Sequence, residues 1–219
     1  GTVNVLQAAR GIGEPLVIVA SSSSVYGANP ILPKHESLMP MPLSPYAASK
    51  LATEQYALAW QHSFGLPTLA FRFFNVFGPY QAAGHAYAAV VPAFVSAALT
   101  GEPVTIHGDG LQSRDFTYVG TVCEVIIDAI ERGVTSPDPV NLAFGSRVTL
   151  LDVIERLERL IGHPIERHHE PTRAGDVRHS QADNTKLQSL FPDVTPTPLD
   201  EGLQATIDWM RPSTPEGTR

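Results

Sequence analysis

The sequence predicts an α/β fold in which a parallel sheet carries helices on both faces. Apolar runs rich in β-branched residues at 16–21 and 68–74 have the composition of strands that are buried on both sides of a sheet. A helical segment from about 45 to 63 separates them, and a third strand-like run at 140–144 follows a further helical segment. Such alternation of strands and helices is typical of parallel sheets.

Capping residues and glycines set the bounds of the elements. Ser44 is a good helix N-cap and Pro45 suits the first helical position, so a helix is expected to begin at about 45. Gly101, Gly133 and Gly162 mark helix ends, because glycine readily adopts the left-handed conformation of a C-cap. The other expected elements are the second half of an amphipathic helix at 1–10, helices at 87–100, 121–132 (capped by Thr121), 149–161 and 199–210, a strand at 104–107 before a turn at 108–110, an irregular proline-rich loop at 27–43, and a disordered tail over 212–219.

The composition is that of an ordinary globular protein, with 43% hydrophobic and 17% charged residues. The net charge of −7 argues against a general nucleic-acid surface. The sequence has no long apolar run and no signal peptide, so we expect no membrane partner and a cytoplasmic location. Cys123, the single cysteine, excludes an internal disulfide and is expected to be buried in a helix. His168 and His169 have no matching ligand cluster, so no metal site is expected.

Tyr46 and Lys50 stand four residues apart, which places them on the same face of the helix that begins at about 45. A cation held beside a phenol stabilises the phenolate, and this makes a general base of a side chain that is ordinarily too weakly acidic. By itself the pair is a weak signal, because one tyrosine and one lysine reach this spacing by chance in any helical protein.

Ser21, Ser22, Ser23 and Ser24 follow the first apolar run directly. They would lie at the carboxyl end of a strand, which is where open α/β sheets bind their ligands. Alone, four serines indicate only a polar loop. Hydroxyl groups at a strand end, followed by a loop and a capped helix with Tyr46 and Lys50, form a more specific combination.

Four motifs in order carry a resemblance to a known family. They are the serine run with Tyr46 and Lys50, then Arg72-Phe73-Phe74-Asn75-Val76-Phe77-Gly78-Pro79, then Gly108-Asp109-Gly110-Leu111-Gln112-Ser113-Arg114-Asp115-Phe116-Thr117-Tyr118-Val119, and finally Arg173-Ala174-Gly175-Asp176. Together they cover nearly everything from Gly1 to about Met210. The chain resembles the extended short-chain dehydrogenases/reductases, specifically the NAD-dependent epimerase/dehydratase family, and it is most similar to the UDP-glucose and UDP-N-acetylglucosamine 4-epimerases.

The resemblance implies a partial Rossmann-type parallel sheet and a smaller C-terminal substrate lobe. By analogy, residues 1–76 form the C-terminal part of the NAD-binding domain, to which segments around 114–144 return. Residues 77–211 form mainly the substrate-binding lobe. The implied cofactor is NAD and the implied substrate is a UDP-hexose, with the N-acetylated forms included.

The resemblance also implies a role for each matched residue. Tyr46 would be the catalytic base, Lys50 its cationic partner, and Ser22 the group that hydrogen-bonds the sugar 4-oxygen. Implied cofactor contacts are Ala20, Ser21, Tyr46, Lys50, Phe73 and Phe74, and implied substrate contacts are Ser22, Ser23, Ser24, Asn75, Arg114, Arg173, Asp176 and Ser180. The two arginines would clamp the diphosphate, and the small Ser180 would leave room for an N-acetyl group.

Two alternatives remain open. Related dehydratases and decarboxylases of nucleotide sugars carry an acidic residue where this chain has Ser23 and Ser24, so epimerisation is the better match. A non-catalytic sugar-nucleotide-binding module is the other possibility, because no Gly-x-x-Gly-x-x-Gly follows a strand in this chain. The family carries that phosphate-binding loop near its N-terminus. We therefore expect a fragment that lacks the first βαβ units, binds NAD⁺ weakly when expressed alone, and lacks epimerase activity.

The helix at 45–63 shows an apolar stripe of Leu51, Tyr56, Ala59 and Trp60. Family members pair this helix and its predecessor in a four-helix dimer interface, so the resemblance implies a homodimer. Burial of the stripe in the core of one chain is the alternative. One departure from the family pattern is Gly120-Thr121, where acidic residues usually follow Tyr118-Val119.

Overall fold

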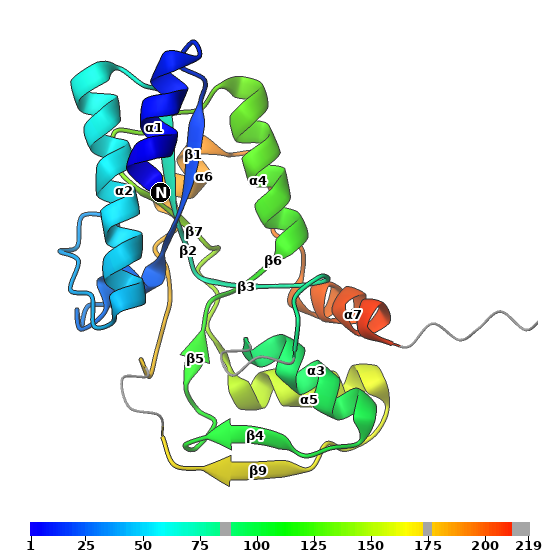
Figure 1. Ribbon diagram of the computed structural model, residues 1–219. Helices are drawn as coiled ribbons and strands as arrows, with labels where there is room; N and C mark the ends of the chain where they lie inside the picture. Colours follow the sequence, from blue (N-terminus) through cyan, green and yellow to red (C-terminus); the bar gives the residue numbers. More distant parts are fainter. Residues whose placement is uncertain (84–88, 173–176, 212–219) are drawn as a thin grey trace, which may run out of the picture.

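The computed structural model of the chain describes residues 1–83, 89–172 and 177–211 (Figure 1). Its central feature is a parallel sheet of β1 (Val17–Ser22), β2 (Thr68–Phe73) and β7 (Val140–Leu142), in the order β1-β2-β7. Phe73 lies opposite Ser22 on one side and Leu142 on the other, so the three strands end at the same edge. The predicted parallel sheet is confirmed.

Helices cover both faces of this sheet, as predicted. Side chains of β2 alternate between the faces, since successive residues of a strand point to opposite sides. Leu69 and Phe71 pack against α4 (Val119–Arg132) and α6 (Thr185–Leu190), whereas Ala70 packs against α2 (Pro45–Phe64). The first helix, α1 (Thr2–Gly11), lies alongside α2 (Figure 1).

A second lobe holds its own core. It contains α3 (Val90–Thr100), α5 (Leu150–Ile161) and α7 (Leu199–Met210), together with the parallel pair β4 (Val104–His107) and β9 (Arg167–Glu170). Short strands connect it to the sheet: β3 (Asn75–Phe77) pairs with β6 (Phe116–Tyr118), and β5 (Ser113–Arg114) pairs with β8 (Val148–Thr149). The second lobe is therefore connected to the sheet at the carboxyl ends of its strands (Figure 1).

The predicted cap of α4 is wrong. The helix begins at Val119 and follows β6 directly, with Tyr118 at the N-cap position. The Thr121 hydroxyl instead donates to Thr197 Oγ1 and accepts from the Thr197 backbone N–H, both at 3.0 Å. A Cβ at position 120 would lie 2.7 Å from the Tyr118 ring, which explains why glycine stands there.

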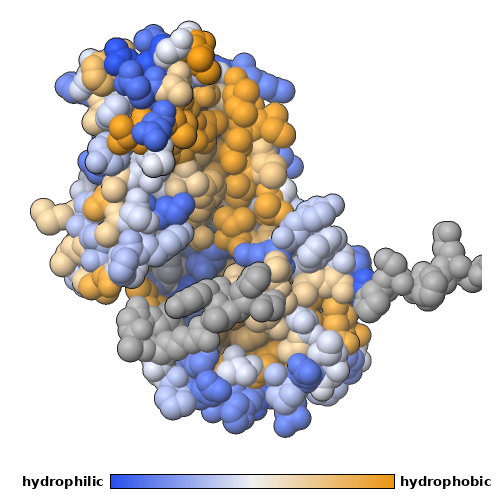
Figure 2. Space-filling model, in the orientation of Figure 1, coloured by the Kyte–Doolittle hydropathy of each residue, from blue (hydrophilic) through white to orange (hydrophobic). Residues whose placement is uncertain are grey.

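Other predictions about single elements also need correction. Cys123 is exposed, because the buried face of α4 is formed by Val122, Val125 and Ala129. Apolar side chains also lie on the exposed side of this helix (Figure 2), where Ile127 and Ile130 are 52% and 61% exposed. The helix expected from 87 begins at Val90, and residues 84–88 lie outside the described residues. So does the predicted tail at 212–219. Across the described ranges, none of the helices has the length and apolar character needed to span a membrane.

Candidate active site

Ser22 ends β1 and caps the short 3₁₀ helix η1 (Ser23–Tyr26) that follows. Its hydroxyl oxygen accepts a hydrogen bond from the Ser24 N–H at 3.2 Å and another from the Ser24 hydroxyl at 2.9 Å. Because Ser22 is the acceptor in both contacts, its own hydroxyl proton remains available for donation. The local turn thus orients this side chain at the carboxyl edge of the sheet.

The start of α2 has the predicted cap. Ser44 Oγ accepts from the Ala47 N–H at 3.1 Å, and Pro45 is the first helical residue. Tyr46 is therefore held in the first turn, where its side chain is 57% exposed. Lys50 Nζ donates to the Ala20 carbonyl at 3.0 Å and lies 5.8 Å from the centre of the Tyr46 ring. The structure thus brings Ala20, Tyr46 and Lys50 together beside the end of β1.

A cavity of about 380 Å³ opens next to these residues. Five residues predicted to contact substrate line it, namely Ser23, Ser24, Asn75, Arg114 and Ser180. They come from η1, β3, β5 and a late segment that pairs with β5, since Ser180 N–H donates to the Ser113 carbonyl at 3.0 Å. Ser44 and Ala47, on either side of Tyr46 in the sequence, also line the cavity.

One part of the cavity wall is strongly basic. Burial, together with the positive charges of Arg147, Arg178 and Arg114, lowers the pKa of His179. This imidazole lines the cavity and is hydrogen-bonded through Nδ1 to Ser113 Oγ at 2.8 Å. The lowered pKa reflects burial and the positive charge on this side of the cavity, where Arg178 is also paired with Asp109 at 2.8 Å.

Other predicted site residues lie elsewhere. Ser21 is buried and its hydroxyl donates to Glu54 Oε2 at 2.7 Å, so it faces α2. Phe73 packs beside Phe71 in the cluster on the α4 face, and Phe74 is 8% exposed in a cluster with Tyr26. Arg173 and Asp176 lie outside the described residues.

Sequence reasoning missed part of the cavity lining, namely Tyr26, Gly27, Lys34, Leu43, Val177 and His179. Most of these residues belong to irregular segments, in which periodicity gives no signal. Gly27 did carry a signal, because a glycine often marks a backbone position that other residues cannot adopt. Its φ is +44°, and a Cβ there would lie 1.9 Å from the Met41 carbonyl oxygen, so only glycine lets the loop close against η1.

Comparisons with known proteins identify the family of the chain. A model of the NAD dependent epimerase/dehydratase family matches residues 1–143. The chain is 33% identical over 214 residues to a UDP-glucuronate 4-epimerase of Thermodesulfobacterium geofontis, covering 96% of this chain and 64% of that protein. It is 37% identical to the solved UDP-N-acetylglucosamine 4-epimerase of Methanobrevibacter ruminantium in complex with UDP-N-acetylmuramic acid, with a TM-score of 0.89 over 95% of this chain and 66% of that one.

A second solved structure is the UDP-glucose 4-epimerase of Thermotoga maritima with UDP-glucose, at 32% identity and a TM-score of 0.87, covering 95% of this chain and 67% of that one. The chain thus spans 64% to 67% of the length of these three proteins. The family model matches well over half of the chain, and the three proteins act on three different UDP-sugars. The chain belongs to the NAD-dependent epimerase/dehydratase family, and its relatives are UDP-sugar 4-epimerases.

Proposed function

We propose that the protein to which this chain belongs catalyses the NAD-dependent 4-epimerisation of a UDP-hexose through a transient 4-keto sugar. The observation that carries the proposal is the cavity: Ser23, Ser24, Asn75, Arg114 and Ser180 line it beside the start of α2. UDP-glucose, UDP-galactose and their N-acetylated forms are the proposed substrates.

In this proposal Tyr46 removes the proton of the sugar 4-hydroxyl. The Lys50 ammonium, held by the Ala20 carbonyl, stabilises the phenolate, and the Ser22 hydroxyl donates a hydrogen bond to the 4-oxygen. NAD, when bound, supplies the oxidising power that makes C4 a ketone and the reducing power that restores an alcohol. The cavity of about 380 Å³ gives the hexose room to turn between the two steps, so that reduction occurs on the opposite face.

The basic wall of the cavity suits the diphosphate of a sugar nucleotide. Arg114 lines the cavity there, and Arg147 and Arg178 add positive charge near His179. A guanidinium group matches the geometry of phosphate oxygens. We assign Arg114 and Arg173 to the diphosphate and Asp176 to the ribose hydroxyls of the UDP group.

The residues present fit the nicotinamide end of NAD. Tyr46 and Ala20 are exposed, and Lys50 stands between them, which leaves a phenol and an ammonium accessible to a ribose. Ser21, Phe73 and Phe74 fit less directly, since the first two side chains face neighbouring helices and the third is buried. We propose that these three residues support the residues of the cofactor site by packing and do not contact the cofactor directly. Without a phosphate-binding glycine loop, the 219 residues alone are proposed to bind NAD⁺ weakly and to lack epimerase activity.

The direct test is to incubate the full polypeptide that contains this chain with NAD⁺ and either UDP-glucose or UDP-N-acetylglucosamine. NMR of the sugar protons distinguishes the two C4 configurations, and we expect the galacto product from each substrate. Formation of a dehydrated or decarboxylated sugar instead would contradict the proposed reaction. No change of either sugar would favour a non-catalytic binding module.

Ser180 sets the substrate range in this proposal. We expect the parental protein to epimerise both UDP-glucose and UDP-N-acetylglucosamine, and Ser180→Tyr to abolish turnover of the N-acetylated sugar only, because the new ring fills the space beside the sugar. Steady-state rates for both substrates measure this. Ser189→Tyr, on the surface of α6, is the matched control. A parental protein that turns over only UDP-glucose would show that the pocket is smaller than proposed.

We also propose a homodimer that forms through α1 and α2. Tyr56 and Phe64 on α2 are each 45% exposed, Val5 on α1 is 59% exposed, and Trp60 makes edge-to-face contacts with both aromatic rings. An exposed apolar surface over two adjacent helices is typical of an interface. Tyr56→Asp should convert a dimer into a monomer in light scattering, and an unchanged mass would contradict this assignment.

A further inference from the structure

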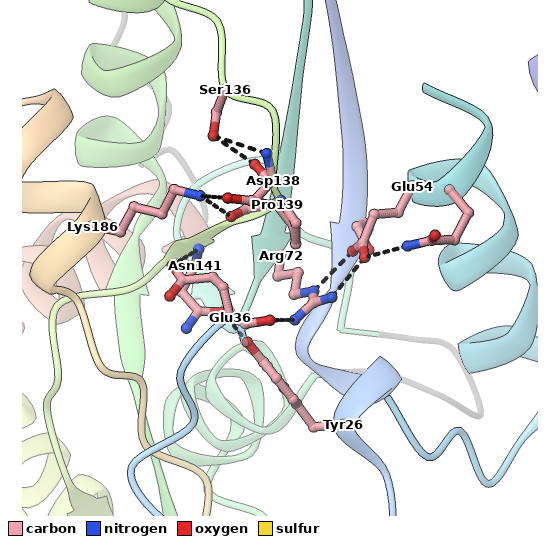
Figure 3. Close-up of polar contacts among 11 residues, drawn as sticks. Tyr26, Glu36, Glu54, Arg72, Ser136, Asp138, Pro139, Asn141 and Lys186 are labelled. Atoms are coloured by element: carbon pink, nitrogen blue, oxygen red, sulfur yellow. Dashed lines mark hydrogen bonds and ion pairs between the residues drawn. The ribbon is translucent and has the colours of Figure 1, made fainter. Parts of the chain in front are cut away.

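A buried polar network lies directly behind the residues assigned to catalysis. Glu54 on α2 and Arg72 on β2 form its centre, with exposed fractions of 0% and 2%. Arg72 Nη2 donates to Glu54 Oε1 at 2.6 Å and Arg72 Nε donates to Oε2 at 2.9 Å, so the pair is bidentate (Figure 3). Arg72 Nη1 also donates to the Glu36 carbonyl at 3.3 Å.

The same pair reaches the end of β1 and the cavity wall. Glu54 Oε2 accepts the hydroxyl proton of Ser21, the neighbour of Ser22. The Arg72 guanidinium lies 4.7 Å from the centre of the Tyr26 ring, which lines the cavity. The Tyr26 hydroxyl donates to Asn141 Oδ1 at 2.7 Å, which ties the network to β7. Figure 3 shows Arg72 between Glu54 of α2 on one side and Tyr26 and Asn141 on the other.

Spacing along α2 connects this network to the base. Tyr46, Lys50 and Glu54 follow one another at intervals of four residues, so they share one face of the helix. Two contacts then hold α2 against the end of β1, one turn apart: Lys50 to the Ala20 carbonyl, and Glu54 to the Ser21 hydroxyl. Any axial or rotational shift of α2 that moves Glu54 must also move Tyr46.

At the centre of the face that α2 presents to the sheet, apolar packing comes from small side chains. The fully buried residues of this 20-residue helix are Ala47, Glu54 and Ala57, while the larger Leu51, Leu58 and Trp60 pack against neighbouring clusters and stay partly buried. Alanines allow close approach to the sheet, but they do not interlock with it as larger side chains do. A bidentate ion pair has a single favourable geometry, and setting register is the best-attested use of a buried ion pair.

We propose that Glu54 and Arg72 are positioning residues, an inference that rests on the proposed function. Their ion pair sets the register of α2 on β1 and β2. It thereby holds Tyr46 and Lys50 in reacting geometry beside Ser22. Neither residue touches the substrate in this assignment. Small displacements of a reacting group lower rates steeply, since a shift of about 1 Å can cost about 10²-fold.

The test replaces both charges at once. Replacing a buried ion pair by apolar residues of similar volume is often neutral for stability, whereas removing one partner leaves an unpaired charge. We expect Glu54→Leu/Arg72→Met in the full polypeptide to keep its melting temperature near the parental value, to lose at least about tenfold in kcat, and to change KM for UDP-glucose by less than about threefold. KM is spared because Arg114 and Ser180 lie outside α2 and β2. The matched control is Asp128→Leu/Arg132→Met, an exposed ion pair of α4, which should leave kcat and KM unchanged.

A second measurement does not depend on activity. Hydrogen–deuterium exchange should increase in residues 47–50 of the double variant while residues 57–64 keep their protection, because only the first turns depend on the pair for their register. If the double variant does not fold, the same measurements on Arg72→Lys test the proposal. Lysine keeps the positive charge but cannot form the bidentate contact of the guanidinium group.

Parental kcat in the folded variant, or unchanged exchange at 47–50, overturns the positioning role. If the parental protein epimerises no sugar, the proposed function fails, and the exchange pattern alone decides whether the pair sets the register of α2.

Discussion

Replacing Tyr46 by phenylalanine is expected to lower kcat for UDP-glucose epimerisation by at least about 10²-fold, which is the lower bound for loss of a general acid–base group. The KM should change little, because the phenol acts mainly in the transition state. Tyr46 is 57% exposed in the first turn of α2, so loss of one hydroxyl leaves no cavity and no unpaired buried group. Steady-state kinetics of the full polypeptide measure both constants.

Tyr80→Phe is the control for this substitution. Tyr80 is 89% exposed and has no role in the proposed reaction, so its variant should keep the parental kcat. A Tyr46→Phe protein with near-parental turnover would remove Tyr46 from the mechanism. A protein that instead loses affinity for the substrate would make Tyr46 a binding residue rather than the base.

Local chemistry explains why much of the fold could be predicted. Ser44 and Pro45 specify a helix start from their own side chains, and Gly65, Gly101, Gly133 and Gly162 each take the left-handed conformation just beyond a helix. The apolar runs of β1 and β2 need no more than their composition to be recognised. Predictions of this kind depend on neighbours in sequence, and apart from the Thr121 cap of α4 they were confirmed to within a few residues.

Long-range contacts explain what was missed. A six-residue helix such as α6 has no capping side chain and depends on burial of Leu187. Lys34 and His179 line the cavity, and each is held in place by an isolated backbone bridge, Lys34 to Ala182 and His179 to Ser113. The local sequence does not predict such pairings.

The buried ion pair was equally hidden. Glu54 has the sequence appearance of a surface helix residue, since glutamate is almost never fully buried unless it is paired. Its partner Arg72 is 18 positions away on β2. Only the packing of α2 on the sheet reveals that the two side chains meet.

Outside that ion pair, loss of the Asp115 side chain is expected to lower the free energy of unfolding most. It is fully buried, and its carboxylate accepts four hydrogen bonds. Oδ2 accepts from the backbone N–H groups of Gly145 and Ala182, each at 3.0 Å. Oδ1 accepts from the backbone N–H and the hydroxyl of Ser146, at 3.2 and 2.9 Å. One carboxylate therefore joins three separate segments beside Arg114 and Ser180.

Asp115→Ala is expected to lower the free energy of unfolding by at least about 3 kcal/mol, because each buried donor left without an acceptor costs about 1–3 kcal/mol. Urea denaturation followed by circular dichroism measures this. Asp109→Ala is the control, since Asp109 is an exposed carboxylate of the same motif that pairs with Arg178 at the surface. It should unfold at a denaturant concentration close to the parental one. A parental-like midpoint for Asp115→Ala would mean that water replaces the lost acceptor.

The dependence on pH separates the charge of Asp115 from its hydrogen bonds. Burial raises the pKa of this carboxyl, and the hydrogen bonds from Ala182, Ser146 and Gly145 only partly oppose the rise. The folded state thus holds the proton more tightly than the unfolded chain. Its contribution to the free energy of unfolding is fully present below about pH 4, the ordinary range of an aspartate, and is lost as pH rises through the raised pKa.

The difference in unfolding free energy between the parental protein and Asp115→Asn should therefore shrink as pH increases from about 4 toward neutrality. Subtracting the variant removes the opposite contribution of surface carboxylates whose pKa is lowered, such as Asp128 beside Arg132. Urea denaturation of both proteins across this range measures the difference. A difference that grows with pH would show that the four donors outweigh burial, and that Asp115 joins the three segments as an ionised carboxylate.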